Sequence, residues 1–179
     1  EGGAQAFWIC PLVAESEVVD LAAAETRAAE LTRQIGVGVG LIHGKMPAAA
    51  KDAIMAEFAE GRLSVLVATT VVEVGVNVPN ATIMVIEHAE RFGLAQLHQL
   101  RGRIGRSDKP SACLLLYTPP LGANAKARLG ILRESEDGFR IAEEDLRLRG
   151  AGEGRGTVRG GFPALGVAGL PAHSDLLEC

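Results

Sequence analysis

Short apolar runs recur along the first two thirds of the chain, and segments of helical composition separate them. The runs cover residues 6–10, 37–42, 64–68, 81–86 and 112–117. Helical composition fills residues 15–34, and Pro47 and Gly61 stand where a second helix should begin and end. Continuous apolar strands that alternate with helices predict an α/β fold, with a parallel sheet covered on both faces.

Four residues come directly after these runs, namely Pro11, His43, Thr69 and Glu87. In a parallel sheet with right-handed crossovers, the carboxyl ends of the strands meet at one edge, where such sheets bind ligands. We therefore expect these four residues at the edge that carries the functional site.

A stretch rich in arginine and glycine runs from Gln99 to Arg106. If it forms a helix, at about 100° per residue, Gln99, Arg103 and Arg106 lie within roughly 60° of one another. Planar guanidinium groups on one face suit a phosphate group, which they can grip bidentately. Two internal glycines each cost about 1 kcal/mol of helix propensity, which indicates that another backbone or a ligand comes very close. The alternative is a solvated arginine face.

The pattern Q-x-x-G-R-x-G-R, within the run from Glu90 to Arg106, resembles the sixth motif of superfamily 2 helicases. The whole run is similar to two bacterial families, the RecG-type ATP-dependent DNA helicases and the transcription-repair coupling factors. In such motors the matching arginines reach across a cleft to the γ-phosphate of ATP on the other lobe. The resemblance implies that Arg103 and Arg106 are arginine fingers, and that Gln99 helps to set the geometry of the cleft.

Two threonines open the segment from Thr69 to Pro79, directly after a predicted strand. Hydroxyls and backbone N–H groups at a strand end can bind phosphate oxygens, although threonines also cap turns. The segment resembles the fifth helicase motif, which implies that Thr69 and Thr70 face DNA phosphate and that Gly75 and Asn77 lie at the nucleotide. The families usually carry Asp where this chain has Asn77, so the charge is lost there.

Two further segments resemble helicase sequences, and the first of them resembles the start of the second motor lobe. The run from Trp8 to Glu17 is similar to RecG-type helicases specifically, because coupling factors typically lack its C-P-L and E-S-E pieces. His43-Gly44-Lys45-Met46 matches both families near the DNA backbone. The resemblance implies a DNA contact by Lys45, whereas His43 is interpreted as a structural loop residue.

Beyond residue 120 the composition predicts two helices, over residues 123–133 and 139–149, and then a glycine-rich loop. Residues 137–153 resemble the translocation segment of both families, a helical hairpin and loop that convert lobe closure into movement on duplex DNA. Arg149 and Glu153 match in place, and the sequence departs from the pattern directly afterwards. A glycine-rich surface loop is the alternative.

The parts for hydrolysing ATP are incomplete in this sequence. The segment Gly40–Met46 approaches the phosphate-loop pattern, but Val39 replaces the first glycine and Met46 the hydroxyl residue. A D-E-x-[DH] carboxylate pair for Mg²⁺ is also missing. We therefore expect ATP and Mg²⁺ to be held mainly by a first lobe outside this chain, and the chain alone to be inactive as an ATPase.

Bulk composition narrows the class of protein. The net charge of −4 announces no nucleic-acid partner, but a local basic patch would be sufficient. Cys10, Cys113 and Cys179 are far apart, which predicts neither a zinc site nor a disulfide framework. The apolar runs are strand-sized and no signal peptide is recognisable, so a reducing bacterial cytoplasm is the expected compartment.

The resemblance extends from about Phe7 to Gly161. It implies a RecA-like three-layer domain in residues 1–119, a helical hairpin and translocation loop in residues 120–161, and a tail in residues 162–179. The expected whole protein is a RecG-type helicase that remodels branched DNA, such as stalled forks and Holliday junctions. Its expected partners are double-stranded DNA and the N-terminal lobe and DNA-recognition domain of the same polypeptide. A coupling-factor lobe and a non-enzymatic domain with a motor fold stay open as alternatives.

Overall fold

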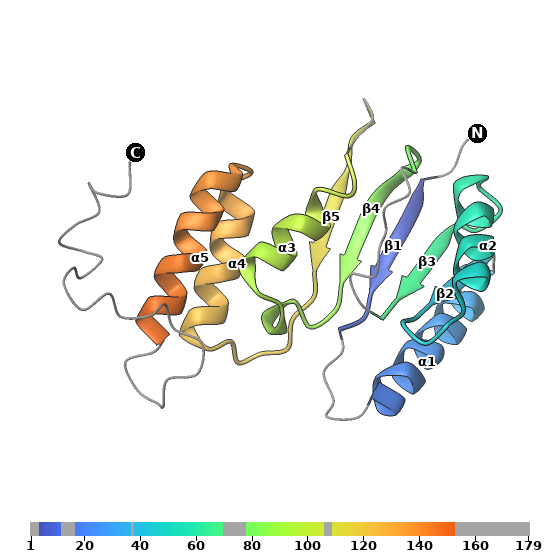
Figure 1. Cartoon of the computed structure of the whole chain (residues 1–179), viewed down its shortest axis with the longest axis horizontal. Coiled ribbons are helices and arrows are strands. Elements are labelled where there is room, and N and C mark those ends of the chain that lie inside the picture. The colour runs from blue at the N-terminus through green and yellow to red at the C-terminus, as the bar shows by residue number, and fades with distance from the viewer. Residues whose placement is uncertain (1–3, 12–16, 37, 70–77, 106–108, 153–179) are drawn as a thin grey trace.

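The computed structural model describes residues 4–11, 17–36, 38–69, 78–105 and 109–152. They form a five-stranded sheet in the order β2-β3-β1-β4-β5, in which every neighbouring pair of strands is parallel (Figure 1). The strands are β1 (Gln5–Ile9), β2 (Val39–Ile42), β3 (Val65–Ala68), β4 (Ala81–Ile86) and β5 (Ala112–Leu115). The predicted parallel sheet is confirmed.

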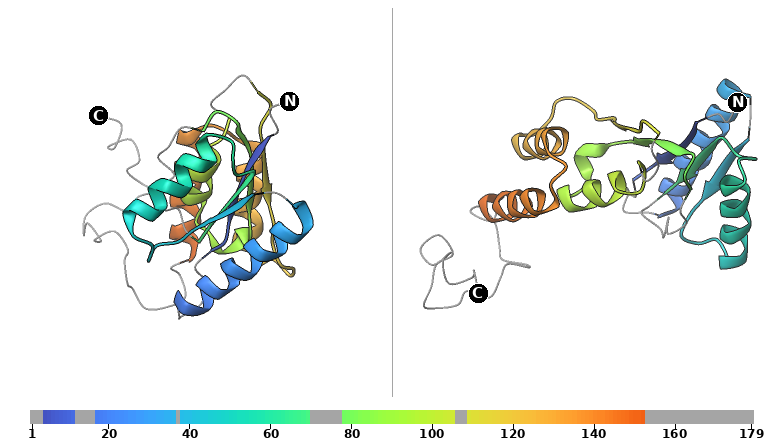
Figure 2. Two further views of the ribbon diagram at one scale, coloured as in Figure 1. Left: turned by 90° about the vertical axis from the view of Figure 1, so that its right-hand side faces the viewer. Right: turned by 90° about the horizontal axis from the view of Figure 1, so that it is seen from above.

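Helices flank the sheet and extend beyond one of its edges. They are α1 (Glu17–Ile35), α2 (Ala48–Ala59), the short 3-10 helix η1 (Ala89–Arg91), α3 (Leu94–Arg101), α4 (Ala123–Glu134) and α5 (Gly138–Gly152). α1 lies on one face of the sheet and α2 on the other, while α4 and α5 form a hairpin next to β5 (Figures 1 and 2). The two predicted C-terminal helices are thus confirmed, and the second continues to Gly152.

The hydrophobic core has one part on each face of the sheet. On the larger side, Phe7 of β1 packs against Phe58 of α2, with ring centroids 5.0 Å apart. α3 joins this side through leucines spaced three residues apart, all at most 1% exposed: Leu94, Leu97 and Leu100. On the smaller side, Ala24 and Leu31 of α1 pack against β3. Residues alternating along each strand therefore enter two different layers.

Coverage of the sheet ends at β5. α1 contacts β2 and β3, and on its side of the sheet Leu114 and Leu116 are 51% and 43% exposed. The prediction that helices cover both faces is therefore wrong for this strand. Its apolar sequence reads like that of a buried strand, and only the tertiary arrangement shows that one face stays open.

Gly40, within β2, is required by close packing against the strand. A Cβ atom on Gly40 would lie 2.8 Å from Leu63 Cδ1 and 3.0 Å from Ile54 Cγ2. Gly40 is therefore needed where α2 and the segment before β3 approach the strand closely.

Pro47 precedes α2 by one residue, with φ of −56°, rather than being its first residue. Among the described residues, no helix is both long and apolar enough to cross a membrane.

Candidate functional site

The carboxyl ends of the central strands lie together at one edge of the sheet. Glu87 N–H donates to Ile9 O at 2.9 Å, and Thr69 N–H donates to Ile42 O at 3.2 Å. His43 begins the loop after β2 at the same edge. The predicted position of these residues is confirmed, because parallel pairing places the ends of neighbouring strands side by side.

The segment after β3 is only partly described. The side chain of Thr69 is enclosed, since the residue is 2% exposed. A contact between its hydroxyl and a DNA phosphate stays a prediction. Thr70, Gly75 and Asn77 lie outside the described residues.

The loop between β2 and α2 is tied to the helix that follows it. Met46 N–H donates to His43 O at 3.1 Å, and Lys51 Nζ donates to Gly44 O at 3.2 Å. His43 is half-buried, whereas Lys45 is exposed at the tip of the loop. This arrangement suits the structural role predicted for His43, and the DNA contact of Lys45 stays a prediction.

α3 ends before the arginine-rich stretch does. Its last residue is Arg101, and the following turn is tightened, because Arg103 N–H donates to Leu100 O at 2.9 Å. Gly105 then has φ of +74°, a left-handed conformation that favours glycine. A Cβ atom there would lie 2.7 Å from Ser111 Oγ, so glycine also permits a close approach of the chain that leads into β5.

The prediction of one continuous helix from Gln99 to Arg106 is therefore wrong. The glycines of this stretch end the helix and turn the chain, instead of lying within helical turns. Gln99 is exposed on α3, and Arg103 is half-buried in the turn beyond it, where it contacts neighbouring groups. Arg106 lies outside the described residues.

Arg101, the last residue of α3, connects this helix to the C-terminal hairpin. Arg101 Nη1 donates to Leu132 O at 2.6 Å and to Ser135 O at 2.9 Å. These carbonyls lie at the carboxyl end of α4, where a helix leaves oxygens without partners of its own. On the same helix, His98 faces the hairpin turn so closely that a Cβ atom on Gly138 would lie 3.2 Å from His98 Nε2. α3 and the hairpin are therefore joined by direct hydrogen bonds and close packing.

The turn of the hairpin is itself well ordered by local hydrogen bonds. Phe139 N–H donates to Asp137 Oδ1 at 2.9 Å, which caps the first turn of α5. Asp137 N–H donates to Ser135 Oγ at 3.2 Å. Leu132 and Ile141, both almost fully buried, join the two helices to the large core. The hairpin is thus packed onto the sheet domain through apolar side chains as well as through Arg101.

A polar cluster stands at the carboxyl edge on the face that α1 covers. The carboxylate of Glu87 accepts hydrogen bonds from Trp8 Nε1 at 2.9 Å and from Arg27 Nε. Arg27 also pairs with Glu30 at 2.6 Å. Burial, followed by the neighbouring Glu87 carboxylate, raises the pKa of the Cys10 thiol to about 12. Cys10 is therefore a protonated, unreactive thiol near neutral pH.

A family comparison decides what this arrangement belongs to. The family model described as "Helicase conserved C-terminal domain" matches residues 3–108, more than half of the chain. The chain belongs to this helicase family. Within the helicase domain, the matched residues include all of the sheet except β5, together with α1, α2 and α3.

Two relatives match nearly the whole of this helicase domain and hairpin. The ATP-dependent DNA helicase RecG of Acidithiobacillus ferridurans is 54% identical over 178 residues, which are 99% of this chain and 26% of the relative. RecG of Escherichia coli (strain K12) is 53% identical over 169 residues, 94% of this chain and 24% of the relative. The chain thus spans about a quarter of the length of these relatives. The predicted resemblance to RecG-type helicases is confirmed.

A solved structure supports the same conclusion for the fold. The helicase domain and hairpin match the structure of RecG bound to a three-way DNA junction with a TM-score of 0.71 and 44% identity. The match covers 89% of this chain and 21% of that chain. The predicted RecA-like α/β fold is confirmed.

Two features of the helicase domain were missed by sequence reasoning. Arg101 stands inside the recognised motif, but its acceptors are main-chain oxygens that no sequence pattern marks. Arg27 and Glu87 are 60 residues apart in sequence, and their pairing follows only from the fold.

Arg149 lies in α5 without a described side chain, and Glu153 lies outside the described residues. Among the described residues, no group of three His, Cys, Asp or Glu side chains could hold a metal ion.

Proposed function

We propose that this chain is the C-terminal motor lobe of a longer ATP-dependent DNA helicase that remodels branched DNA, such as stalled forks and Holliday junctions. The identity to RecG over almost the whole chain supports this function. The likeness to RecG bound to a three-way DNA junction supports branched DNA as the substrate. The chain acts with the N-terminal lobe and DNA-recognition domain of the same polypeptide, in the bacterial cytoplasm.

One observation carries the proposal: Arg101, at the end of the helix that bears the proposed nucleotide residue Gln99, donates to main-chain oxygens of the proposed translocation hairpin. Its guanidinium group holds two main-chain carbonyls at the turn between α4 and α5, so a rotation of α3 moves the hairpin as well. A motor needs such a rigid connection, because hydrolysis does work only when closure of the lobes moves a part that touches DNA.

The nucleotide side of the mechanism uses the end of α3. ATP, bound with Mg²⁺ mainly by the other lobe, supplies the phosphoryl group whose transfer to water drives the cycle. Gln99 and Arg103 offer an amide and a guanidinium group, a donor set that fits phosphate oxygens. Arg103 and Arg106 stabilise the charge that develops on the γ-phosphate, and Gln99 orients the cleft. Gly75 and Asn77 complete the nucleotide contacts.

The DNA side uses loops at the carboxyl edge and the segment after the hairpin. Lys45 is exposed and reaches a backbone phosphate as a flexible point charge. Thr69 and Thr70 contribute hydroxyl and N–H donors. Arg149 and Glu153 belong to the translocation segment, which pushes along duplex DNA when the lobes close.

We assign three regions to these tasks. Residues 1–119 form the RecA-like lobe, residues 120–161 form the hairpin with the translocation loop, and residues 162–179 form a tail. Since the chain lacks a phosphate loop and a carboxylate pair for Mg²⁺, it binds no hydrolysable ATP by itself.

The decisive experiment compares the 179-residue chain with the full-length protein that contains it. DNA-stimulated ATP hydrolysis is measured together with unwinding of a model fork. We expect turnover and unwinding from the full-length protein only. Turnover by the chain alone contradicts the half-motor assignment. Displacement of a stalled RNA polymerase without fork unwinding would instead identify a coupling factor, and the absence of any ATPase in the full-length protein would identify a non-enzymatic domain.

A single substitution tests the translocation segment. Arg149→Ala in the full-length protein should keep DNA-stimulated ATP hydrolysis and lose fork unwinding, because the push on DNA is separated from hydrolysis. The matched control is Arg147→Ala, two residues earlier on α5, where the arginine side chain is 73% exposed and pairs with Glu144. Unwinding that survives Arg149→Ala contradicts the role of the hairpin.

A further inference from the structure

The two edge strands of the sheet, β2 and β5, differ in the exposure of their side chains. Every residue of β2 is buried or half-buried, with α1 on one face and α2 on the other. On β5 and directly after it, Leu114, Leu116 and Tyr117 are 51%, 43% and 53% exposed. They are three of the six exposed large hydrophobic residues in the part of the chain that the structure describes. Native proteins usually protect an edge strand with charges, proline or a bulge, and the segment from Ala112 to Tyr117 has none of these.

The open edge of β5 also presents main-chain hydrogen-bonding groups. Leu116 N–H donates to Ile86 O at 2.9 Å, so the groups of this residue point toward β4. Because successive residues of a strand alternate in direction, the N–H and C=O groups of Cys113 and Leu115 point away from β4. An additional extended strand would meet donors and acceptors at these two positions.

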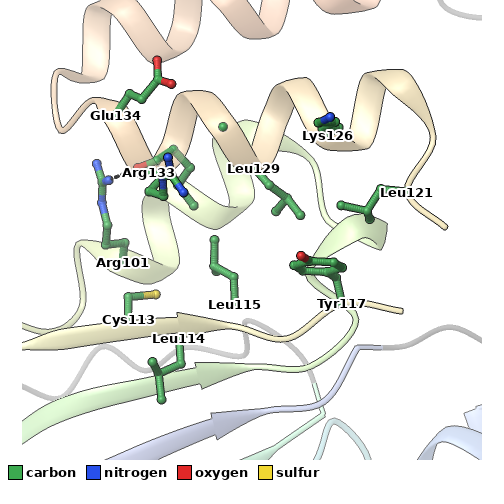
Figure 3. A pocket seen from close by; sticks show the side chains of 12 residues that line it. Arg101, Cys113, Leu114, Leu115, Tyr117, Leu121, Lys126, Leu129, Arg133 and Glu134 are labelled. Carbon is green, nitrogen blue, oxygen red and sulfur yellow. Dashed lines mark hydrogen bonds between the residues drawn. The ribbon is translucent and has the colours of Figure 1, made fainter. Parts of the chain in front are cut away.

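A groove of about 600 Å³ runs beside this edge, between β5 and α4. In Figure 3, Leu115 and Tyr117 from the strand side and Leu121 and Leu129 from the helix side converge on the space, whereas Leu114 points to the opposite side of β5. The groove is therefore apolar along its floor. Alternate side chains of an added strand would enter it.

The border of the groove carries mainly positive charge. Arg101, Lys126 and Arg133 line it together with one acidic residue, Glu134. Arg101 is already bound to main-chain carbonyls, but Lys126 and Arg133 are exposed on α4. The local excess of cations contrasts with the net charge of −4 of the whole chain. An acidic segment therefore complements the groove better than a basic or neutral one does.

We infer that the β5–α4 groove is a docking site for an extended segment of a partner protein in which apolar residues alternate with Asp or Glu. The segment adds a strand to β5, its main chain pairs with Cys113 and Leu115, and its apolar side chains fill the groove. Its carboxylates lie near Lys126 and Arg133. This interaction goes beyond the proposed motor function, because it uses none of the residues assigned to nucleotide or DNA.

The test uses a fluorescein-labelled peptide of alternating leucine and glutamate with blocked ends, and the matching leucine–lysine peptide as its counterpart. Binding to the 179-residue chain and to the full-length protein is followed by fluorescence anisotropy. We expect the glutamate peptide to bind both proteins and the lysine peptide to bind neither. The inference is overturned if the glutamate peptide fails to bind one of the two proteins. Binding to the 179-residue chain but not to the full-length protein would mean that another part of the polypeptide occupies the groove.

Variants separate this groove from general stickiness. Tyr117→Ala should weaken binding of the glutamate peptide about tenfold, because Tyr117 lines the groove and is 53% exposed, as expected for an anchor residue. Ile35→Ala is the matched control, because Ile35 is 44% exposed on α1, away from the groove. The double change Lys126→Glu and Arg133→Glu should transfer binding from the glutamate peptide to the lysine peptide, which a merely damaged fold cannot do. Equal binding by all variants overturns the inference.

A second copy of this chain is the alternative to a partner segment as the occupant of the groove. Sedimentation of the 179-residue chain at several concentrations measures its oligomeric state. We expect a monomer. A dimer that Tyr117→Ala converts to monomer would make the groove an interface between copies and would overturn the partner assignment.

Discussion

The two ends of the sheet differ in how far their edge strands are covered and in how the neighbouring helices are attached. At one end, which we call the β2 end, β2 lies between α1 and α2 and its side chains are enclosed. At the other, the β5 end, β5 is open on one face, α3 stops at a glycine-rich turn, and an arginine holds the hairpin of α4 and α5. Apolar packing holds both ends together, but the β5 end adds the hydrogen bonds of Arg101 and leaves one face of its strand open. The difference shows that an edge strand can be fully covered at one end of a sheet and left accessible at the other.

The largest expected effect concerns Arg106, the proposed arginine finger that follows Gly105 in the sequence. Arg106→Ala in the full-length protein should lower DNA-stimulated turnover by about 10³–10⁵-fold, the range known for arginine fingers, and leave ATP binding mostly intact. Steady-state ATPase assays and nucleotide titration measure the two quantities. Arg62→Ala, at an exposed position of the β2 end, is the control and should leave turnover unchanged. Near-normal turnover of the Arg106 variant would contradict the arginine-finger role proposed for Arg106.

The next effect compares one phenylalanine from each end. Phe58→Ala should lower the free energy of unfolding by about 3–5 kcal/mol, because Phe58 is fully buried against Phe7. Phe139→Ala, on α5, should change it by less than about 0.5 kcal/mol, because Phe139 is 91% exposed. Urea denaturation of the 179-residue chain gives both values. Similar losses at the two positions would contradict the burial of Phe58 and the exposure of Phe139.

A smaller effect is expected for the joint between α3 and the hairpin. Arg101→Ala removes two hydrogen bonds from a charged donor and leaves Leu132 O and Ser135 O without that donor. The free energy of unfolding should fall by about 2–3 kcal/mol. Urea denaturation measures the loss, and Arg133→Ala, an exposed arginine of α4, serves as the control with almost no change. In the full-length protein, the same Arg101 variant should lose more unwinding than ATP hydrolysis, and an equal loss of both would argue against a mechanical link.

The smallest effect compares two glycines with positive φ. Gly61, with φ of +79° at the β2 end, has open space around it, so Gly61→Ala should cost about 1 kcal/mol of left-handed strain. Gly105→Ala should cost about 2 kcal/mol, because the added methyl group also meets Ser111 Oγ. Thermal unfolding of both variants measures the difference. Equal costs would show that the turn after α3 has room to relax.

The regular elements were predictable because each is determined locally. The five predicted strands agree with the observed ones to within two residues at each end, since apolar runs bounded by turn residues leave few alternatives. The helix that follows Pro47 is equally well marked. Predicting the open face of β5 failed, because Leu114 has the same local sequence signal whether or not a helix covers it.

The candidate site was predictable only in part. The motif around Gln99 and Arg103 was recognised from its letters, but the helical face drawn through it was wrong, because Gly105 adopts a left-handed turn. Arg101 escaped notice since its role depends on carbonyl oxygens of residues more than thirty positions away. Residue types reveal which chemistry is available, whereas partners distant in sequence appear only once the chain has folded.

The acceptors of Arg101 have a consequence for how this protein can change over generations. Main-chain oxygens are present whatever amino acid occupies a position, so mutations within the hairpin cannot delete the groups that receive the guanidinium fork. The requirement for a specific side chain falls on one partner alone. Sequence drift in the hairpin is therefore limited by the packing of buried side chains such as Leu132 and Ile141, and not by the hydrogen bonds of Arg101.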